Sequence, residues 1–362
     1  MTRETLLCLI RSAVLPECQA IPSNESIDWR GLIDEAERQG VAVIASDGLQ
    51  RLYDSGLYVA HDDKALRLMK ASWFGETITY EQRYARQLAD AEKLGRVWAK
   101  AGIRTIVLKG FTVSACYPYP SHRFCADFDC FLVKDGEHMN AYEEGNRVME
   151  GLGIQVNRDH YKNSAFDFRG LRVENHKFCS QFRGNKQLLR LEKLLQGELL
   201  AGAESSIGET GLFAPPPVFS ALFMVVHAYF HFLHEGLNLR HVLDWVMFRR
   251  FHATDVDWKV IDDRCREFGF SRFLSSLDAI GEYVLGAKPL EDLTTNDRRL
   301  LEDMWKGPVL HGKRRGLGLR FSIADHTLRA AWKYRLFSPI SMVHALWIQI
   351  KGYFFIKHPT LS

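Results

Sequence analysis

Two short segments with the composition of β-strands interrupt a chain that otherwise shows helical periodicity. Residues 103–108 (IRTIVL) and 128–133 (FDCFLV) are rich in β-branched and aromatic residues, and charged residues or Gly follow both. Apolar residues recur every three to four positions before residue 96, and the same spacing returns from about residue 188. We therefore predict an α+β fold in which a small mixed sheet lies between N-terminal and C-terminal helical regions.

Further local signals extend this arrangement. Residues 166–168 and 171–176 are expected to pair as a hairpin that turns at Arg169-Gly170, and residues 139–152 to form a helix. The alternative is a mostly helical interaction protein in which the hairpin is incidental. The predicted domains are an N-terminal helical region (1–95), an α/β core (96–210), a C-terminal helical domain (211–335) and an amphipathic tail (336–362).

Composition and charge exclude several classes of protein. The 362 residues are 46% hydrophobic and 25% charged, as in ordinary globular proteins, so long disordered segments are not expected. The 47 basic and 44 acidic side chains leave a net charge of +3, which gives no strong signal for nucleic-acid binding. Seven cysteines without regular spacing are typical of reduced thiols and favour a cytoplasmic protein. No run of about 18 uncharged apolar residues occurs, so no membrane span is expected.

Two aspartates at the start of the second strand are the first candidate site. Side chains alternate along a strand, so Asp127 and Asp129 are expected to share a face. Neighbouring carboxylates repel unless a positive charge lies between them, and a hard divalent cation is a suitable partner. A surface or capping pair is the ordinary alternative, but the apolar residues 130–133 indicate that this strand enters a core.

Lys109-Gly110 ends the first strand. A strand that ends in Gly can bring backbone N–H groups close to a phosphate. The simpler interpretation is a turn that starts a helix, with a solvated lysine.

Together these features resemble the DNA polymerase β-type nucleotidyltransferase superfamily. More specifically, the chain is similar to a bacterial family of uncharacterised nucleotidyltransferases, whose pattern is LKG, a Tyr-Pro loop, an Arg, a D-x-D strand and a later V-D/E-x-H strand. The specific resemblance covers residues 107–133 and 171–178 and is loose elsewhere. The matching residues are Leu108-Lys109-Gly110, Tyr117-Pro118, Arg123, Asp127-Phe128-Asp129 and Val173-Glu174-Asn175-His176.

The resemblance implies a small nucleotidyltransferase core and a metal-dependent enzyme. Such an enzyme moves a nucleoside monophosphate from an NTP, with ATP the first candidate, to an unidentified small-molecule or macromolecular acceptor, with Mg²⁺ or Mn²⁺ as cofactor. Asp127, Asp129 and Glu174 are the implied catalytic residues and metal ligands, and Glu174 completes the metal site or accepts the acceptor's proton. The implied nucleotide-binding residues are Lys109, Gly110, Ser114, Arg123, His176, His227 and His231.

The chain departs from the superfamily pattern in the turn. Phe111 follows Gly110 where the superfamily usually has Ser or Gly, so the hydroxyl that normally helps to hold a phosphate is missing. Ser114, one helical turn later, is a candidate substitute. Arg123 suits bidentate phosphate binding, and an ion pair with Asp127 is its alternative.

A second constellation lies on a later helix. His227, His231 and His234 are spaced i, i+4 and i+7, so one helix face carries three imidazoles. That spacing can bind zinc, but the helix is also aromatic, which favours buried, hydrogen-bonded histidines. A third interpretation has this face closing over the nucleotide, with His227 or His231 touching phosphate or acceptor. The alternatives to a transferase are thus a catalytically silent nucleotide- or metal-binding module and a metal hydrolase using the His-rich helix.

The last segment, residues 338–362, has apolar residues at helical spacing. Lys351 and Lys357 are its only certain positive charges, whereas helices that lie in a membrane interface usually have a richly basic face. We expect this tail to dock onto protein, either the helical domain or a second subunit, and the oligomeric state is left open. The basic cluster at residues 313–315 is expected to be a solvated loop.

Overall fold

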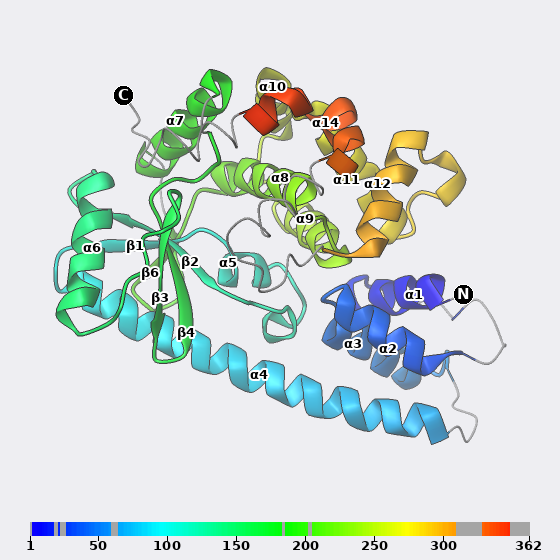
Figure 1. The fold of residues 1–362 in the computed structure, drawn as a ribbon. Helices are drawn as coiled ribbons and strands as arrows, with labels where there is room; N and C mark the ends of the chain where they lie inside the picture. Colours follow the sequence, from blue (N-terminus) through cyan, green and yellow to red (C-terminus); the bar gives the residue numbers. More distant parts are fainter. Residues whose placement is uncertain are drawn as a thin grey trace.

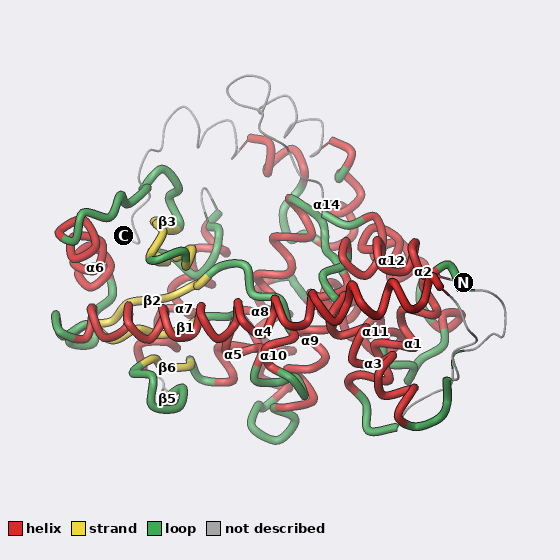
Figure 2. Tube along the Cα trace, turned by 90° about the horizontal axis from the view of Figure 1, so that it is seen from below, coloured by secondary structure: helices red, strands yellow, loops and turns green. Residues whose placement is uncertain are grey.

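A long helix connects a group of helices to a small sheet (Figure 1). This computed structural model describes residues 2–17, 21, 27–58, 64–182, 185–201, 205–308 and 328–347. The Asp28 carboxylate accepts a hydrogen bond from the Gly31 N–H at 3.0 Å, which begins the second helix. The helices before the sheet are α1 (Thr2–Val14), α2 (Trp29–Arg38), α3 (Ala42–Asp54) and α4 (Lys64–Ala99). Viewed from below, α4 crosses the molecule from these helices to the strands (Figure 2).

Six strands form one mixed sheet in the order β3-β4-β2-β1-β6-β5. β1 and β2 are antiparallel, whereas β2 with β4 and β1 with β6 are parallel. The predicted α+β class is confirmed, and the hairpin turns at Arg169-Gly170, where both residues have positive φ. The strands are β1 (Arg104–Val107), β2 (Phe128–Val133), β3 (Asn163–Phe168), β4 (Leu171–His176), β5 (Ser205–Ser206) and β6 (Leu212–Ala214).

β5 and β6 have no counterpart in the sequence-based expectation. They are two and three residues long, too short to show an alternating pattern. β6 pairs with β1 through Thr105 and Ile106, so the sheet continues past residue 210. The proposed domain limits stay a prediction.

The remaining helices surround the sheet and extend beyond it. Helices are present where helical spacing returns in the sequence, and they include α8 (Pro217–His234) and α9 (Leu239–Phe251). In the part of the chain that the structure describes, α8 is a helix with the length and the apolar composition needed to cross a membrane. However, 61% of it is buried inside the protein, as in a core helix. The remaining helices are α5 (Phe111–Ser114), α6 (Met139–Gly151), α7 (Lys186–Ala201), α8 (Pro217–His234), α9 (Leu239–Phe251), α10 (Trp258–Phe268), α11 (Ser271–Val284), α12 (Thr295–Lys306) and α14 (Ala331–Phe337), with short 3₁₀ turns at Pro120–His122 and Leu290–Asp292.

Alternation along β2 divides its side chains between two apolar clusters. Cys130 and Leu132 pack in a cluster with residues of α4 and α6. Phe131 and Val133 belong to the larger cluster, which includes α7 and α8. Asp129 alternates with Cys130, so the strand directs its carboxylate to the same side as Phe131, toward α8.

The tail predicted over residues 336–362 is described only as far as residue 347. Ile340 packs against the core and Ala345 is buried, whereas Trp347 is 52% exposed. Docking of this tail onto protein stays a prediction, because the rest of it lies outside the described residues, as does the basic cluster at residues 313–315.

Candidate active site

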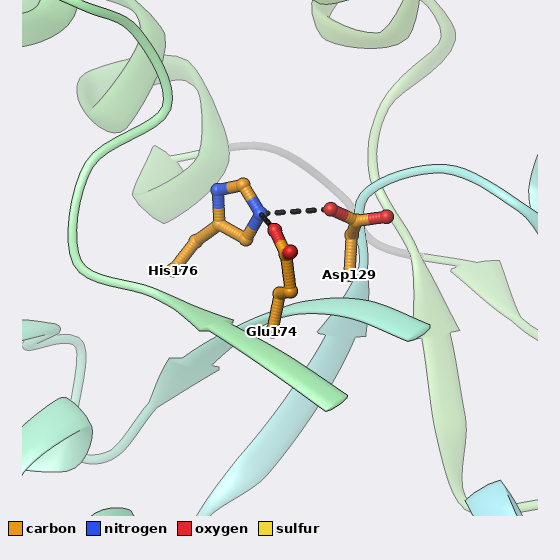
Figure 3. A group of neighbouring side chains, drawn as sticks. All are labelled: Asp129, Glu174 and His176. Atoms are coloured by element: carbon orange, nitrogen blue, oxygen red, sulfur yellow. Dashed lines mark hydrogen bonds and ion pairs between the residues drawn. The ribbon is translucent and has the colours of Figure 1, made fainter. Parts of the chain in front are cut away.

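Three side chains that can bind a metal lie together on one face of the sheet. Asp129 on β2 and Glu174 on β4 are neighbours in register, and His176 follows on the same face of β4. His176 Nε2 lies 2.9 Å from Asp129 Oδ1 and 3.8 Å from Glu174 Oε2 (Figure 3). One ligand atom from each side chain lies within 4.8 Å of the other two. Parallel pairing and the two-residue period of the strands bring these groups together.

Charge interactions in this group are strong because it is largely buried. Burial disfavours the ionised Asp129 carboxyl, but Lys109 and His176 outweigh this effect and lower the pKa of Asp129 below its usual value. Burial raises the pKa of Glu174, and the charges of Asp129 and Asp127 raise it further. The mutual repulsion of these carboxylates is what a bound cation would relieve.

Asp127 lies just before β2 and pairs with an arginine on the hairpin. Its Oδ1 is 3.2 Å from Arg172 Nε, and it is not one of the three clustered ligands. Burial raises the pKa of Asp127; Arg172 opposes this shift and the charge of Asp129 adds to it. The two aspartates therefore influence each other, but Asp129 is the one that lies beside Glu174. The metal-ligand role of Asp127 stays a prediction.

Lys109 and Gly110 adjoin the acidic group. Lys109 Nζ lies 3.3 Å from Asp129 Oδ2 and 2.7 Å from His227 Nε2 on α8. Gly110 has a φ of +80° and precedes α5, a backbone conformation that strains other residues. The end of β1 thus places the lysine ammonium group beside Asp129, and the chain turns sharply at Gly110.

Ser114 and Arg123, both expected to bind phosphate, have protein partners. The Ser114 hydroxyl is buried and donates to the Gly110 carbonyl oxygen at 3.0 Å. Arg123 donates from Nε and Nη2 to the two carboxylate oxygens of Asp244 on α9, at 2.9 and 2.6 Å. The ion pair considered for Arg123 thus forms with Asp244 and not with Asp127. Phosphate binding by either residue stays a prediction.

Phe111 is part of the core. Its ring packs against Tyr84 of α4 and Phe128 of β2, with centroid distances of 5.2 and 6.2 Å. The position where the superfamily usually has Ser or Gly therefore faces the contact between α4 and the sheet, not the acidic group.

The histidines of α8 extend away from Lys109. His227 accepts a hydrogen bond from Lys109, and the centre of its ring lies 4.5 Å from that of His231. His231 Nδ1 in turn forms a hydrogen bond with Glu235 Oε2 at 2.9 Å. Burial, followed by the charge of Lys109, lowers the pKa of His227 well below its usual value, so this imidazole is neutral. Among the described residues, the histidines of α8 form no metal-binding group with other ligands.

A family model described as an uncharacterised nucleotidyltransferase matches residues 25–280, more than half of the chain. The chain belongs to this family. No match was found among curated proteins or among solved structures. The matched range contains all the candidate site residues of this nucleotidyltransferase, from Lys109 to His231.

Two residues at the start of the hairpin, Lys162 and Asn163, also adjoin this site, and neither was predicted from the sequence. Asn163 Nδ2 donates to Glu174 Oε2 at 2.7 Å. Burial, followed by the charge of Lys109, lowers the pKa of Lys162. The nearby charges of Asp129 and Glu174 oppose this shift. When the two strands are paired residue by residue outward from the turn at Arg169-Gly170, Asn163 lies opposite His176. The predicted hairpin could therefore have indicated that Asn163 lies near the site.

Two arginines from separate helices stack on one ring near the site. Arg83 of α4 and Arg240 of α9 lie 4.6 and 5.4 Å from the centre of the Phe124 ring. The charge of Arg83 acts on the carboxyl of Asp127, and Arg240 Nε is buried without a hydrogen-bond partner among the described residues. Arg83 belongs to no motif, so no local pattern indicated it, whereas Arg240 follows the histidines of α8 in the sequence and belongs to the same constellation.

Proposed function

We propose that this protein transfers a nucleoside monophosphate from an NTP to an acceptor in a metal-dependent reaction. The observation that carries the proposal is the pairing of Asp129 with Glu174 across two parallel strands, with Lys109 at the end of the next strand. Family membership supports nucleotidyl transfer in general. The choice of ATP and the nature of the acceptor come from the sequence resemblance alone.

The donor set fits a divalent cation. Two carboxylates that repel each other, Asp129 and Glu174, supply the oxygen ligands that Mg²⁺ and Mn²⁺ prefer. Asp127 lies at the edge of the group, where Arg172 now neutralises it. When bound, the cation offsets phosphate charge and stabilises the attacking and leaving oxygens.

The basic residues around this group have the distribution expected of a triphosphate site. Lys109 contacts Asp129 and also donates a hydrogen bond to the neutral imidazole of His227, which orients the ammonium group. Arg83 and Arg240 lie on the Phe124 side and supply further positive charge.

In the proposed reaction, an acceptor oxygen bonds to the α-phosphorus. The bond from that phosphorus to the bridging oxygen of the β-phosphate breaks, and pyrophosphate leaves. The acceptor's proton passes to Asp127 or Glu174, the two carboxylates whose pKa values are raised. Lys109 stabilises the charge on the departing phosphates.

Calorimetric binding of a non-hydrolysable NTP analogue tests the site, and transfer of labelled α-phosphate to fractionated small molecules tests the reaction. We expect binding to need Mg²⁺ or Mn²⁺ and to weaken at least tenfold in Asp129→Asn and Glu174→Gln, but not in Glu143→Gln on α6. Binding that survives both substitutions would refute the metal–triphosphate site. Metal-dependent binding with no transfer to any fraction would favour the catalytically silent module. A cytoplasmic location stays a prediction.

A further inference from the structure

We propose that His176 is a nitrogen ligand of the catalytic cation and that the site therefore binds Mn²⁺ in preference to Mg²⁺. This inference rests on the proposed function, because it concerns the cation of the same site. It adds a ligand to the carboxylates implied by the family resemblance, and it selects Mn²⁺ from the two expected metals.

The first support is the position of His176 Nε2. It lies 2.9 Å from Asp129 Oδ1 and 3.8 Å from Glu174 Oε2 (Figure 3). Adjacent ligands of an octahedral ion with bonds of about 2.1 Å are roughly 3 Å apart, which is the separation between this nitrogen and the Asp129 oxygen. The other oxygen of Asp129, Oδ2, faces Lys109, so a cation bound here would replace the hydrogen bond between Nε2 and Oδ1.

The second support is the other ring nitrogen. His176 Nδ1 lies 3.3 Å from the carbonyl oxygen of Phe178. Histidines that bind metals usually donate their second N–H to a carbonyl or carboxylate, which directs the lone pair of the other nitrogen at the metal. An imidazole with a single N–H can serve only one of its two acceptors here, the Phe178 carbonyl or the Asp129 carboxylate. A cation at Nε2 would satisfy the second contact.

The segment that carries this carbonyl is held in place. Glu192 of α7, which is fully buried, accepts from the backbone N–H groups of Cys179 and Ser180 at 2.9 and 2.6 Å and from the Ser180 hydroxyl at 2.7 Å. The Phe178 N–H donates to the Lys162 carbonyl at 3.0 Å. Since the ring of His176 is itself only 1% exposed, its orientation is fixed before any cation binds.

A nitrogen ligand changes which ion binds best. Mg²⁺ strongly prefers oxygen and water ligands, whereas imidazole binds more tightly to first-row transition ions. Two carboxylates keep the site hard enough for Mn²⁺, which also accepts phosphate oxygens. We therefore expect Mn²⁺ to bind at least tenfold more tightly than Mg²⁺ in the absence of nucleotide.

Electron paramagnetic resonance of Mn²⁺ bound to the full chain tests this assignment. Loss of the free-ion signal gives the dissociation constant, and pulsed measurements detect nitrogen-14 coupled to the bound ion. We expect imidazole coupling in the unaltered protein and no such coupling in His176→Gln, with Mn²⁺ affinity about tenfold or more weaker. Mg²⁺ affinity, measured by competition, should change less than threefold. His252→Gln, just after the end of α9, is the matched control, and circular dichroism checks that each variant is folded.

The outcomes separate this inference from the proposed function. Bound Mn²⁺ without nitrogen coupling would show that His176 is not a ligand, while a carboxylate-bound cation and the proposed function stand. Coupling that persists in His176→Gln would also overturn the assignment. Failure of both ions to bind, with or without the NTP analogue, would instead overturn the metal-dependent function.

Discussion

Replacing Asp244 with alanine should destabilise the protein by about 4–6 kcal/mol, because it leaves a buried guanidinium without its partner and removes a hydrogen bond from Tyr117. The Arg123 and Asp244 side chains are only 8% and 10% exposed, and they form a two-point ion pair. Removing one member of a buried pair costs about 3–5 kcal/mol. Tyr117 also loses a hydrogen bond to Asp244 (2.7 Å), which adds about 1 kcal/mol.

Urea unfolding followed by fluorescence and circular dichroism measures this loss. A double-mutant cycle with Arg123→Met should show that the two substitutions together cost less than the sum of their separate effects, since neither charge then remains unpaired. The Arg123 guanidinium is already paired with Asp244 and is not needed for phosphate binding. We therefore expect the affinity of folded Arg123→Met for the NTP analogue to be within threefold of that of the unaltered protein. Arg147→Met, at an exposed position on α6, is the control.

Two results would refute this reasoning. One is a cost below about 1 kcal/mol for Asp244→Ala, which would mean that the pair is hydrated or dispensable. The other is an Arg123→Met variant with an unchanged unfolding midpoint that no longer binds the analogue. That outcome would return Arg123 to the phosphate-binding role implied by the sequence resemblance.

Further substitutions test packing and charge elsewhere. Gly48→Ala would place a Cβ 1.8 Å from the Leu9 carbonyl oxygen, so thermal unfolding should show a loss of about 1–3 kcal/mol, while Gly75→Ala in open space on α4 should be neutral or stabilising. Phe111→Ser should cost about 3 kcal/mol or more in urea unfolding without improving binding of the NTP analogue, because this side chain lies in the core. Burial lowers the pKa of His138 from 6.5 to about 4, so the unfolded chain binds this proton first as the pH falls. The free energy of unfolding should therefore drop by about 3 kcal/mol between those pH values, and His138→Phe should remove that part of the slope; an unchanged slope would contradict it.

The sequence by itself determined the local elements of this protein. A short apolar segment rich in aromatic residues identified β2, and Arg169-Gly170 identified the turn of the β3–β4 hairpin, because Gly readily adopts the positive φ that the turn needs. Helical periodicity identified α8 and α9 in the same way. These signals depend on residues within a few positions of one another, so they can be recognised without knowing the rest of the fold.

The candidate site was only partly accessible to such reasoning. The motif indicated Asp129, Glu174 and His176 as residue types, but not that one oxygen and one nitrogen would lie 2.9 Å apart. That distance depends on the parallel register of β2 and β4, which are separated in the sequence by α6 and β3. No short-range pattern sets the register of strands so far apart in the chain.

Tertiary structure alone decided the partners of the charged residues. Arg123 pairs with Asp244 on α9, Asp127 with Arg172 on the hairpin, and Lys109 with a histidine of α8. A long flexible side chain can reach any of several opposite charges, and the choice depends on which elements the apolar clusters hold together. Burial then makes the choice matter, because a charge left unpaired in the interior costs several kcal/mol whereas the same charge in water costs almost nothing.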